Sequence, residues 1–280
     1  MHEPKARRLS LTEVAERLGV HYMTVYRYVR TGKLPARREG GQWWVSASDL
    51  DRLAQEPAAP RRRGAPHWAQ HTKRLCDRLV SGDEPGAWQL VERALAGGAE
   101  PTEIYVRALG PALRQVGDRW AQGTLEVAGE HRATAVAARL IGRLGPRFAR
   151  RGRHRGTIVL GAAPGDSHAL PAAMLADVMR GQGYLVVDLG GSTPIESFAS
   201  ATAEADTLRA VGISAATTEG LDSATDAIRE LRPRLAGIPI LLGGPAVGAE
   251  SLAREAGADG WAGDAAEAIA VLEGLIRRRL

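Results

Sequence analysis

The spacing of apolar and polar residues divides the chain into three segments. Apolar residues recur at helical intervals in short stretches of residues 1–56, and again throughout residues 67–150. In residues 156–280, short and nearly continuous apolar runs alternate with helical patterns. Helices repeat every 3.6 residues, whereas parallel strands that are buried on both faces are apolar along their whole length. We therefore predict a multidomain protein with a small helical domain, a helical bundle and an α/β domain.

The first segment is predicted to form a winged helix-turn-helix. Ser10 and Glu13 occupy the N-cap and capping-box positions of a first helix. A second helix is expected over residues 22–31. A Gly-Gly turn then joins a basic strand to an aromatic strand within residues 37–45. A helix over residues 47–55 completes the unit, in which the second helix exposes hydroxyl and guanidinium groups.

The run TEVAERLGVHYMTVYRYVRTGKLPA resembles the DNA-binding domains of the excisionase and MerR-like proteins. The resemblance implies that the second helix enters the major groove of double-stranded DNA and that the hairpin is the wing. It also implies which side chains meet bases or phosphates, namely Thr24, Tyr26, Arg27, Arg30, Arg37 and Arg38. The alternative is a small protein-interaction domain with solvated arginines.

The middle of the chain is predicted to be helical throughout. Residues 57–66 have the Pro, Ala, Gly and Arg bias of an extended linker. Four amphipathic helices follow, with expected bounds of 67–80, 85–97, 101–120 and 124–147. Gly110-Pro111 should kink or break the third of them. Short loops between four helices predict a four-helix bundle within residues 67–150.

Residues 156–280 are predicted to form a flavodoxin-like, Rossmann-like domain with a parallel sheet. The expected strands, each followed by a helix, are 157–163, 184–190, 208–214, 238–244 and 258–262. In such a sheet, ligands bind beyond the carboxyl ends of the strands. Residues that can take part in binding should therefore be sought at those ends.

The composition of the chain limits its possible metal sites, disulfides and cellular compartment. The chain has 280 residues and a single cysteine, Cys76, which excludes an intramolecular disulfide and a cysteine-based metal site. No apolar run is long enough for a membrane helix, and the N-terminus lacks the apolar stretch of a secretory signal. We therefore expect a cytoplasmic protein without a membrane partner.

The charge is distributed unevenly along the chain. Residues 1–63 carry 13 Lys and Arg against 7 Asp and Glu, a net charge of +6. Residues 64–155 carry 15 against 9, again +6, whereas residues 156–280 carry 9 against 16, a net −7. A basic front half and an acidic back half favour nucleic-acid binding by the front. Chance in an arginine-rich sequence is the alternative.

Three predicted strand ends carry residues that can bind a ligand. Asp166-Ser167-His168 follows the first strand, Ser214 ends the third, and Gly243-Gly244 ends the fourth. Separately each is weak, because a lone histidine is more often structural and Gly-Gly is commonly a turn. Together, with 42 and 26 residues between the three parts, they match the cobalamin-binding pattern DxHxxG, SxL, GG. The domain thus resembles the cobalamin-binding domain of methionine synthase and its relatives.

The resemblance implies a role for each of these residues. His168 would be the axial ligand of cobalt, with Asp166 on its other ring nitrogen to fix tautomer and basicity. Ser214 would bind the displaced nucleotide tail of the cofactor, while Gly243 and Gly244 allow close backbone approach. Two positions depart from the pattern, since Pro171 replaces its glycine and Ala216 its leucine. A flavodoxin-like domain that has lost its corrinoid is the alternative.

The bundle carries a second group of candidate residues. Periodicity alone favours a core position for Trp120 and a surface position for His131. However, the runs VGDRWAQG and VAGEH resemble the helical cap of cobalamin-dependent photoreceptor regulators. There, Trp120, Glu130 and His131 would cover the upper face of the cobalamin. Ala121 stands where light-sensing relatives have a histidine, so a stable bis-histidine light state is not expected.

The order of the three segments resembles that of CarH/LitR-type regulators. It implies a cobalamin-dependent transcriptional repressor rather than an enzyme. Adenosylcobalamin, or else methylcobalamin, would favour a homo-oligomer, a dimer or tetramer, that grips operator DNA and is released by light. Two alternatives stay open: a corrinoid methyl carrier of a methyltransferase system, and a cobalamin-level sensor that does not respond to light.

Overall fold

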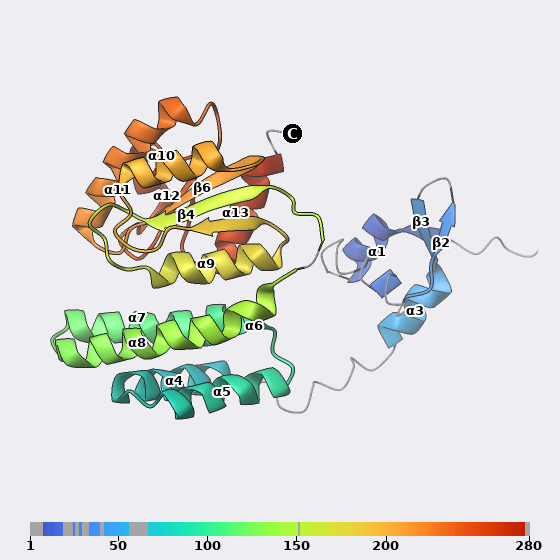
Figure 1. The fold of residues 1–280 in the computed structure, drawn as a ribbon. Helices are drawn as coiled ribbons and strands as arrows, with labels where there is room; N and C mark the ends of the chain where they lie inside the picture. The colour runs from blue at the N-terminus through green and yellow to red at the C-terminus, as the bar shows by residue number, and fades with distance from the viewer. Residues whose placement is uncertain are drawn as a thin grey trace, which may run out of the picture. The chain divides into compact units, whose positions relative to one another are not determined.

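The computed structural model describes residues 8–18, 25, 28–29, 34–39, 42–55, 67–150 and 152–277. The chain separates into two compact units, residues 1–63 and 64–280, and each is considered by itself (Figure 1). Among the described residues, no helix is both long and apolar enough to cross a membrane.

The first unit is a small helical domain with a three-stranded antiparallel sheet. Its elements are β1 (Arg8–Ser10), α1 (Leu11–Leu18), β2 (Arg37–Glu39), β3 (Gln42–Ser46) and α3 (Ala47–Gln55), and the sheet has the order β1-β3-β2. The predicted capping box is confirmed, because Ser10 N–H donates to Glu13 Oε2 at 2.7 Å and Glu13 N–H to Ser10 Oγ at 3.3 Å. Strand β1 was not predicted. It forms because Leu9 pairs with Val45 in the domain core.

The second unit begins with a helical bundle. Its elements are α4 (Trp68–Ser81), α5 (Glu84–Ala96), α6 (Pro101–Ile104), a π-helical turn (Tyr105–Leu109), α7 (Gly110–Ala121), α8 (Val127–Leu144) and a 3-10 turn (Gly145–Phe148). The predicted third helix thus consists of α6, the π-helical turn and α7. Gly110 N–H donates to the carbonyl of Tyr105, five residues back, so the distortion precedes the Gly-Pro pair instead of lying on it.

The proline explains a buried threonine. Pro111 has no N–H to offer the carbonyl four residues earlier, that of Arg107. The hydroxyl of Thr72 on α4 donates to this carbonyl at 2.8 Å, and Thr72 is 5% exposed. A polar side chain in the bundle core therefore replaces the hydrogen bond that the proline removes.

The α/β part has a five-stranded parallel sheet in the order β5-β4-β6-β7-β8, which is the flavodoxin-like order. Its elements are β4 (Thr157–Ala162), α9 (Leu170–Gly181), β5 (Leu185–Asp188), α10 (Ile195–Glu204), β6 (Leu208–Ser214), α11 (Thr218–Leu231), a 3-10 turn (Arg232–Arg234), β7 (Ile240–Gly243), α12 (Glu250–Glu255), β8 (Gly260–Ala262) and α13 (Ala265–Arg277). Helices α9 and α13 pack on one face of the sheet, and α10, α11 and α12 on the other. The predicted fold classes are confirmed.

The bundle packs on the α/β part through α9. Val178 of α9 belongs to the apolar core of the bundle. The Tyr105 hydroxyl, in the π-helical turn, donates to Asp177 Oδ2 of α9 at 2.7 Å, and its ring stacks on Phe148 with centroids 5.2 Å apart. The turn between α7 and α8 lies at the same end of this unit as the carboxyl ends of the strands (Figure 1).

Candidate cofactor site

The loop between β4 and α9 lies at the point where the strand order of the sheet changes direction. The chain leaves β4 for β5 on one side and then returns to β6 on the other. Such switch points leave a crevice beyond the carboxyl ends of the two strands, where open α/β sheets bind ligands. Asp166 and His168 lie in this loop.

Asp166 joins the two sides of the crevice. Its Oδ1 accepts the backbone N–H of His168 at 3.0 Å and lies 2.7 Å from His168 Nδ1. Its Oδ2 accepts the N–H of Ala216, in the loop after β6, at 2.6 Å. The side chain of Asp166 is fully buried, while that of His168 is 52% exposed. One carboxylate therefore spans the switch point and anchors a histidine that a ligand can reach.

The surroundings of Asp166 favour its charged form. Burial opposes ionisation, but hydrogen bonds from Ala216 and from the backbone and ring of His168 outweigh it and lower the pKa of Asp166. A charged carboxylate at Nδ1 holds the proton of the neutral imidazole on that nitrogen. Nε2 is then left as the basic nitrogen that can bind a metal.

Neighbouring segments fix this loop from two further directions. Ser192, after β5, donates its N–H to the carbonyl of Asp166 at 2.6 Å and accepts the N–H of Gly165 on its hydroxyl at 3.2 Å. In the first turn of α11, a Cβ at Gly220 would lie 2.6 Å from Asp166 Oδ2. The carboxylate thus lies directly against the start of a helix, where negative charge is stabilised.

The other predicted residues lie along the same edge of the sheet. Ser214 is paired in register with Ala162 on one side and Gly243 on the other, and Gly243 is paired with Ala262. This row of small residues closes the carboxyl edge on the face covered by α9 and α13. Ala162 lies two residues after Leu160 and so points to the same face, and Leu160 and Ala262 pack in the core on that face.

The Gly-Gly pair also serves the fold itself. Gly244 has a φ of +109°, and a Cβ there would collide with the backbone of Ala215. Ala246 N–H donates to the carbonyl of Ala215 at 3.1 Å. Glycine is therefore required where the loops after β6 and β7 cross, whatever the crevice holds.

The cap candidates lie where α7 ends and α8 begins. Trp120 is 53% exposed, so the core position that periodicity favoured is wrong. The side chain of Glu130 is largely buried and accepts the Thr134 hydroxyl at 2.7 Å. His131 is 74% exposed, with Nε2 3.8 Å from Glu130 Oε2. The exposed Trp120 in the last turn of α7 and the exposed Val127 at the start of α8 leave apolar surface uncovered at this end of the bundle.

The structure describes two of the six candidate DNA-binding residues. Arg37 and Arg38 are exposed on β2, opposite Trp44 and Trp43 of β3, as predicted for a hairpin. Four candidates lie outside the described residues, namely Thr24, Tyr26, Arg27 and Arg30, and so does the linker of residues 57–66. Val25, from the same predicted helix, is helical and fully buried.

Some contributions to the site could not be predicted from sequence motifs. Ala216 acts through its backbone N–H, which no side chain signals. Gly220 acts by having no side chain, although Thr217, whose hydroxyl accepts Gly220 N–H at 3.0 Å, marks a helix start that could have pointed to it. Ser192 follows two glycines after a strand, an ordinary turn signal that does not show which loop it supports.

Three protein families match the chain. A B12 binding domain matches residues 156–272, a second B12 binding domain model matches residues 72–144, and a helix-turn-helix domain matches residues 8–57. The chain therefore combines an N-terminal helix-turn-helix with B12-binding domains that include both the bundle and the α/β part.

Known proteins of two kinds are similar to it. The chain is 31% identical over 127 residues to trimethylamine corrinoid protein 1 of Methanosarcina acetivorans, covering 44% of this chain and 58% of that protein. It is 33% identical over 185 residues to the HTH-type transcriptional repressor CarH of Myxococcus xanthus, covering 65% of this chain and 60% of that one. The chain thus spans less than two thirds of either relative.

A solved structure confirms the fold of the second unit. The Methanosarcina barkeri monomethylamine corrinoid protein superimposes with a TM-score of 0.64 at 22% sequence identity. The match covers 74% of this chain and 99% of that structure. At this identity the likeness concerns the fold of bundle and sheet.

Proposed function

We propose that this chain is a cobalamin-dependent DNA-binding transcriptional regulator, a repressor, and not an enzyme. One observation carries the proposal: a helix-turn-helix domain is joined in one chain to B12-binding domains with a preset Asp166–His168 pair. Among the similar proteins, the repressor from Myxococcus xanthus supports this combination. A small basic winged domain has a use in a regulator and none in a carrier of methyl groups.

The residues of the crevice fit a corrinoid. Within the described residues, no three His, Cys, Asp or Glu side chains cluster as a metal site, which agrees with a metal that arrives inside its own macrocycle and needs one protein ligand. His168 Nε2 would bind cobalt, and Asp166 would orient the imidazole and raise its basicity. Ser167, Ser214, Gly243 and Gly244 would line the path of the nucleotide tail. Adenosylcobalamin would supply a cobalt–carbon bond that light can cleave.

The bundle would close the site from above. Trp120, Glu130 and His131 lie at the α7–α8 turn, at the same end of the unit as the carboxyl ends of the strands (Figure 1). The exposed ring of Trp120 would pack on the upper ligand of the cofactor. Cofactor binding would in this way bury apolar surface that is otherwise exposed.

Assembly would turn cofactor binding into regulation. One winged domain binds DNA weakly, but two joined domains bind with the effective concentration that their linkage sets. The cofactor-bound chain would therefore form a homo-oligomer that grips operator DNA through several winged domains, with Arg37 and Arg38 on phosphates. We place this protein in the cytoplasm.

The test uses the full-length chain with adenosylcobalamin. Holo-protein should select DNA from a random-sequence pool, retain it in a gel shift in the dark and release it after green illumination. Replacing His168 with alanine should abolish the absorption spectrum of histidine-ligated cobalamin, while replacing the exposed His154 should not. If His168→Ala binds the cofactor with the wild-type spectrum, the axial assignment is wrong.

A second candidate is a corrinoid methyl carrier that binds methylcobalamin. The similarity to trimethylamine corrinoid protein 1 of Methanosarcina acetivorans favours it. A holo-protein that selects no DNA in any cofactor state would favour the carrier. DNA binding that depends on cobalamin but ignores light would instead indicate a cobalamin-level sensor, as Ala121 beside Trp120 allows.

A further inference from the structure

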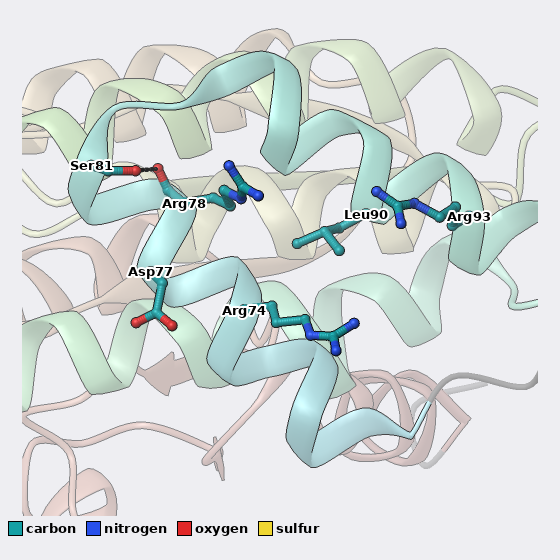
Figure 2. A pocket seen from close by; sticks show the side chains of 6 residues that line it. All are labelled: Arg74, Asp77, Arg78, Ser81, Leu90 and Arg93. Atoms are coloured by element: carbon teal, nitrogen blue, oxygen red, sulfur yellow. Dashed lines mark hydrogen bonds between the residues drawn. The ribbon is translucent and has the colours of Figure 1, made fainter.

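The bundle carries a pocket of about 430 Å³ that belongs to no part of the cofactor site. It opens between α4 and α5, and its lining residues are Arg74, Asp77, Arg78, Ser81, Leu90 and Arg93. Figure 2 shows the side chains of Arg74, Arg78 and Arg93 around Leu90. Helices α7 and α8 lie between this helix pair and the α/β part (Figure 1).

The spacing of the sequence explains why the arginines converge. Arg74, Arg78 and Ser81 follow one another at intervals of four and three residues, so they share one face of α4. Leu90 and Arg93 are three residues apart and share a face of α5. Leu90 is 6% exposed and belongs to the bundle core. The pocket therefore has an apolar floor and a rim of guanidinium groups.

Two of these arginines have no acidic partner among the described residues. Arg78 pairs with Asp83, and Asp77 pairs with Lys73 at 3.1 Å, so these charges are already balanced. Arg93 contacts only neutral oxygens of Gln89, at 3.3 and 3.5 Å. Arg74 makes no ion pair within the described part of the chain. The pocket thus has two positive charges that the protein does not compensate.

His71 lies one turn before Arg74 on the same face of α4. The charges of Arg74 and Arg93 both act on its imidazole, so the two guanidinium groups must lie near the same point. Burial lowers the pKa of His71, a hydrogen bond to the backbone of Leu90 opposes this, and the fields of Arg74 and Arg93 lower the pKa further. Its Nε2 is buried and has no partner in the described residues. The neutral imidazole of His71 adds no charge to the pocket. The positive potential of the two arginines can therefore be neutralised by an anion from solution.

We propose that this pocket binds a phosphate group through Arg74 and Arg93, with Arg78 at its edge. Guanidinium groups match phosphate oxygens with paired N–H donors, and such charge-assisted bonds are the strong ones. The Ser81 hydroxyl, which donates to the Arg78 carbonyl at 3.1 Å, lies in the same pocket. The volume falls in the range of small-ligand sites. The phosphate comes either from a free phosphorylated compound or from a DNA backbone.

The first arm of the test uses inorganic pyrophosphate and the full-length chain at low salt. Calorimetry should detect binding to the wild type and at least a roughly tenfold weaker affinity in the Arg74→Gln/Arg93→Gln double variant. Glutamine keeps helix propensity at these exposed positions, and equal unfolding midpoints would show that the fold is kept. The control Arg114→Gln removes one positive charge from an exposed site on α7, outside the pocket, and should bind as the wild type does.

The second arm uses duplex DNA and rests on the proposed function. Each neutralised phosphate contributes about 0.9 to the slope of log K against log salt concentration. Because the pocket binds one phosphate group, the double variant should lose about one from this slope if the phosphate belongs to DNA. An unchanged slope with weakened pyrophosphate binding would assign a free phosphorylated ligand. If the double variant matches the wild type in both arms, or pyrophosphate does not bind and the slope is unchanged, the proposal is overturned. A wild type that binds no DNA would refute the proposed function, while the first arm still tests the pocket.

Discussion

Asp166 and Asp177 are the two aspartates buried in the described residues of the α/β part, at 3% and 5% exposure, and they accept hydrogen bonds from different kinds of donor. Asp166 accepts backbone N–H groups of His168 and Ala216 in addition to the imidazole. Asp177 accepts only side chains, the Tyr105 hydroxyl at 2.7 Å and Arg180 Nη1 at 3.0 Å. One carboxylate is fixed by its own domain, while the other depends on a residue of the bundle.

The difference indicates what each aspartate does. Backbone donors stay in place when a side chain moves, so Asp166 keeps its position while His168 exchanges solvent for a ligand. The hydrogen bond from Tyr105 forms only when the bundle is packed on α9. Asp166 therefore prepares a binding site, whereas Asp177 joins two parts of the fold. Substitutions should separate these roles, with binding affected at one position and stability at the other.

Asp177→Ala should have the largest effect on stability. It leaves the buried Tyr105 hydroxyl with only the distant Ile141 carbonyl, at 3.5 Å, as an acceptor. It also removes the partner of Arg180, and together these losses should cost about 3 kcal/mol in the free energy of unfolding. Urea unfolding of the full-length chain measures the loss. Asp226→Ala, which breaks an exposed pair with Arg229, should change it by less than about 1 kcal/mol. Equal losses in the two variants would show that Asp177 does not join the bundle to α9.

Asp166→Asn should act on binding instead. The amide keeps the shape of the side chain but loses the charge that supports the imidazole. We expect cobalamin affinity to fall about 10- to 100-fold, with a smaller loss of stability than in Asp177→Ala. Spectrophotometric titration with adenosylcobalamin provides the measurement, and Asp226→Asn is the control. Unaltered affinity in Asp166→Asn would mean that the carboxylate only supports the loop.

The contrast between Asp166 and Asp177 also shows which contacts can be predicted from the sequence. Continuous apolar runs predicted all five strands of the sheet, and residues 208–214 coincide with β6. Burial on both faces explains the pattern of β4, whose residues are all buried. The edge strand β5 is apolar too, although its Leu185 and Val187 are partly exposed. Asp166 and His168 were predicted to interact because they match the first part of the cobalamin-binding pattern, in which both residues lie in one short loop. Asp177 and Tyr105 are 72 residues apart, and no local pattern connects them.

Other features depended on geometry that single residues do not encode. Strand β1 is three residues long and exists because β3 is there to pair with it. The π-helical turn precedes the proline that was expected to mark the distortion. Periodicity alone favoured a core position for Trp120, but it lies in the last turn of α7 and is 53% exposed.

A glycine next to Asp166 allows a sharper test of its preset position. A Cβ at Gly220 would approach Asp166 Oδ2 to 2.6 Å, whereas a Cβ at Gly142, in the last turn of α8, would meet nothing within 4 Å. Gly220→Ala should displace the carboxylate and weaken cobalamin binding by about tenfold, a value near the lower end of outer-shell effects. Gly142→Ala should leave affinity unchanged and stabilise the helix by up to about 1 kcal/mol. Equal affinities in the two variants would contradict the preset geometry.

The smallest expected effects concern Tyr105, the bundle residue that donates to Asp177, and how its ionisation changes stability with pH. Burial, followed by the hydrogen bond to Asp177 and the charge of that carboxylate, raises the pKa of Tyr105. The stability that depends on its neutral hydroxyl is thus fully present below the unfolded tyrosine pKa of about 10 and is lost as pH rises above it. Tyr105→Phe should cost about 1–2 kcal/mol at pH 7, and urea midpoints should show this gap narrowing above about pH 10.

Tyr184 is the matched control, because its hydroxyl is buried without a partner among the described residues and burial also raises its pKa. Removing an unpaired hydroxyl costs little, so Tyr184→Phe should be neutral or stabilising at pH 7. The alkaline loss should weaken in both variants, since neither phenylalanine can ionise. Both sites share the ionisation of a buried tyrosine, but only Tyr105 donates a hydrogen bond to Asp177. A loss of stability at pH 7 in Tyr105→Phe but not in Tyr184→Phe would therefore measure that hydrogen bond.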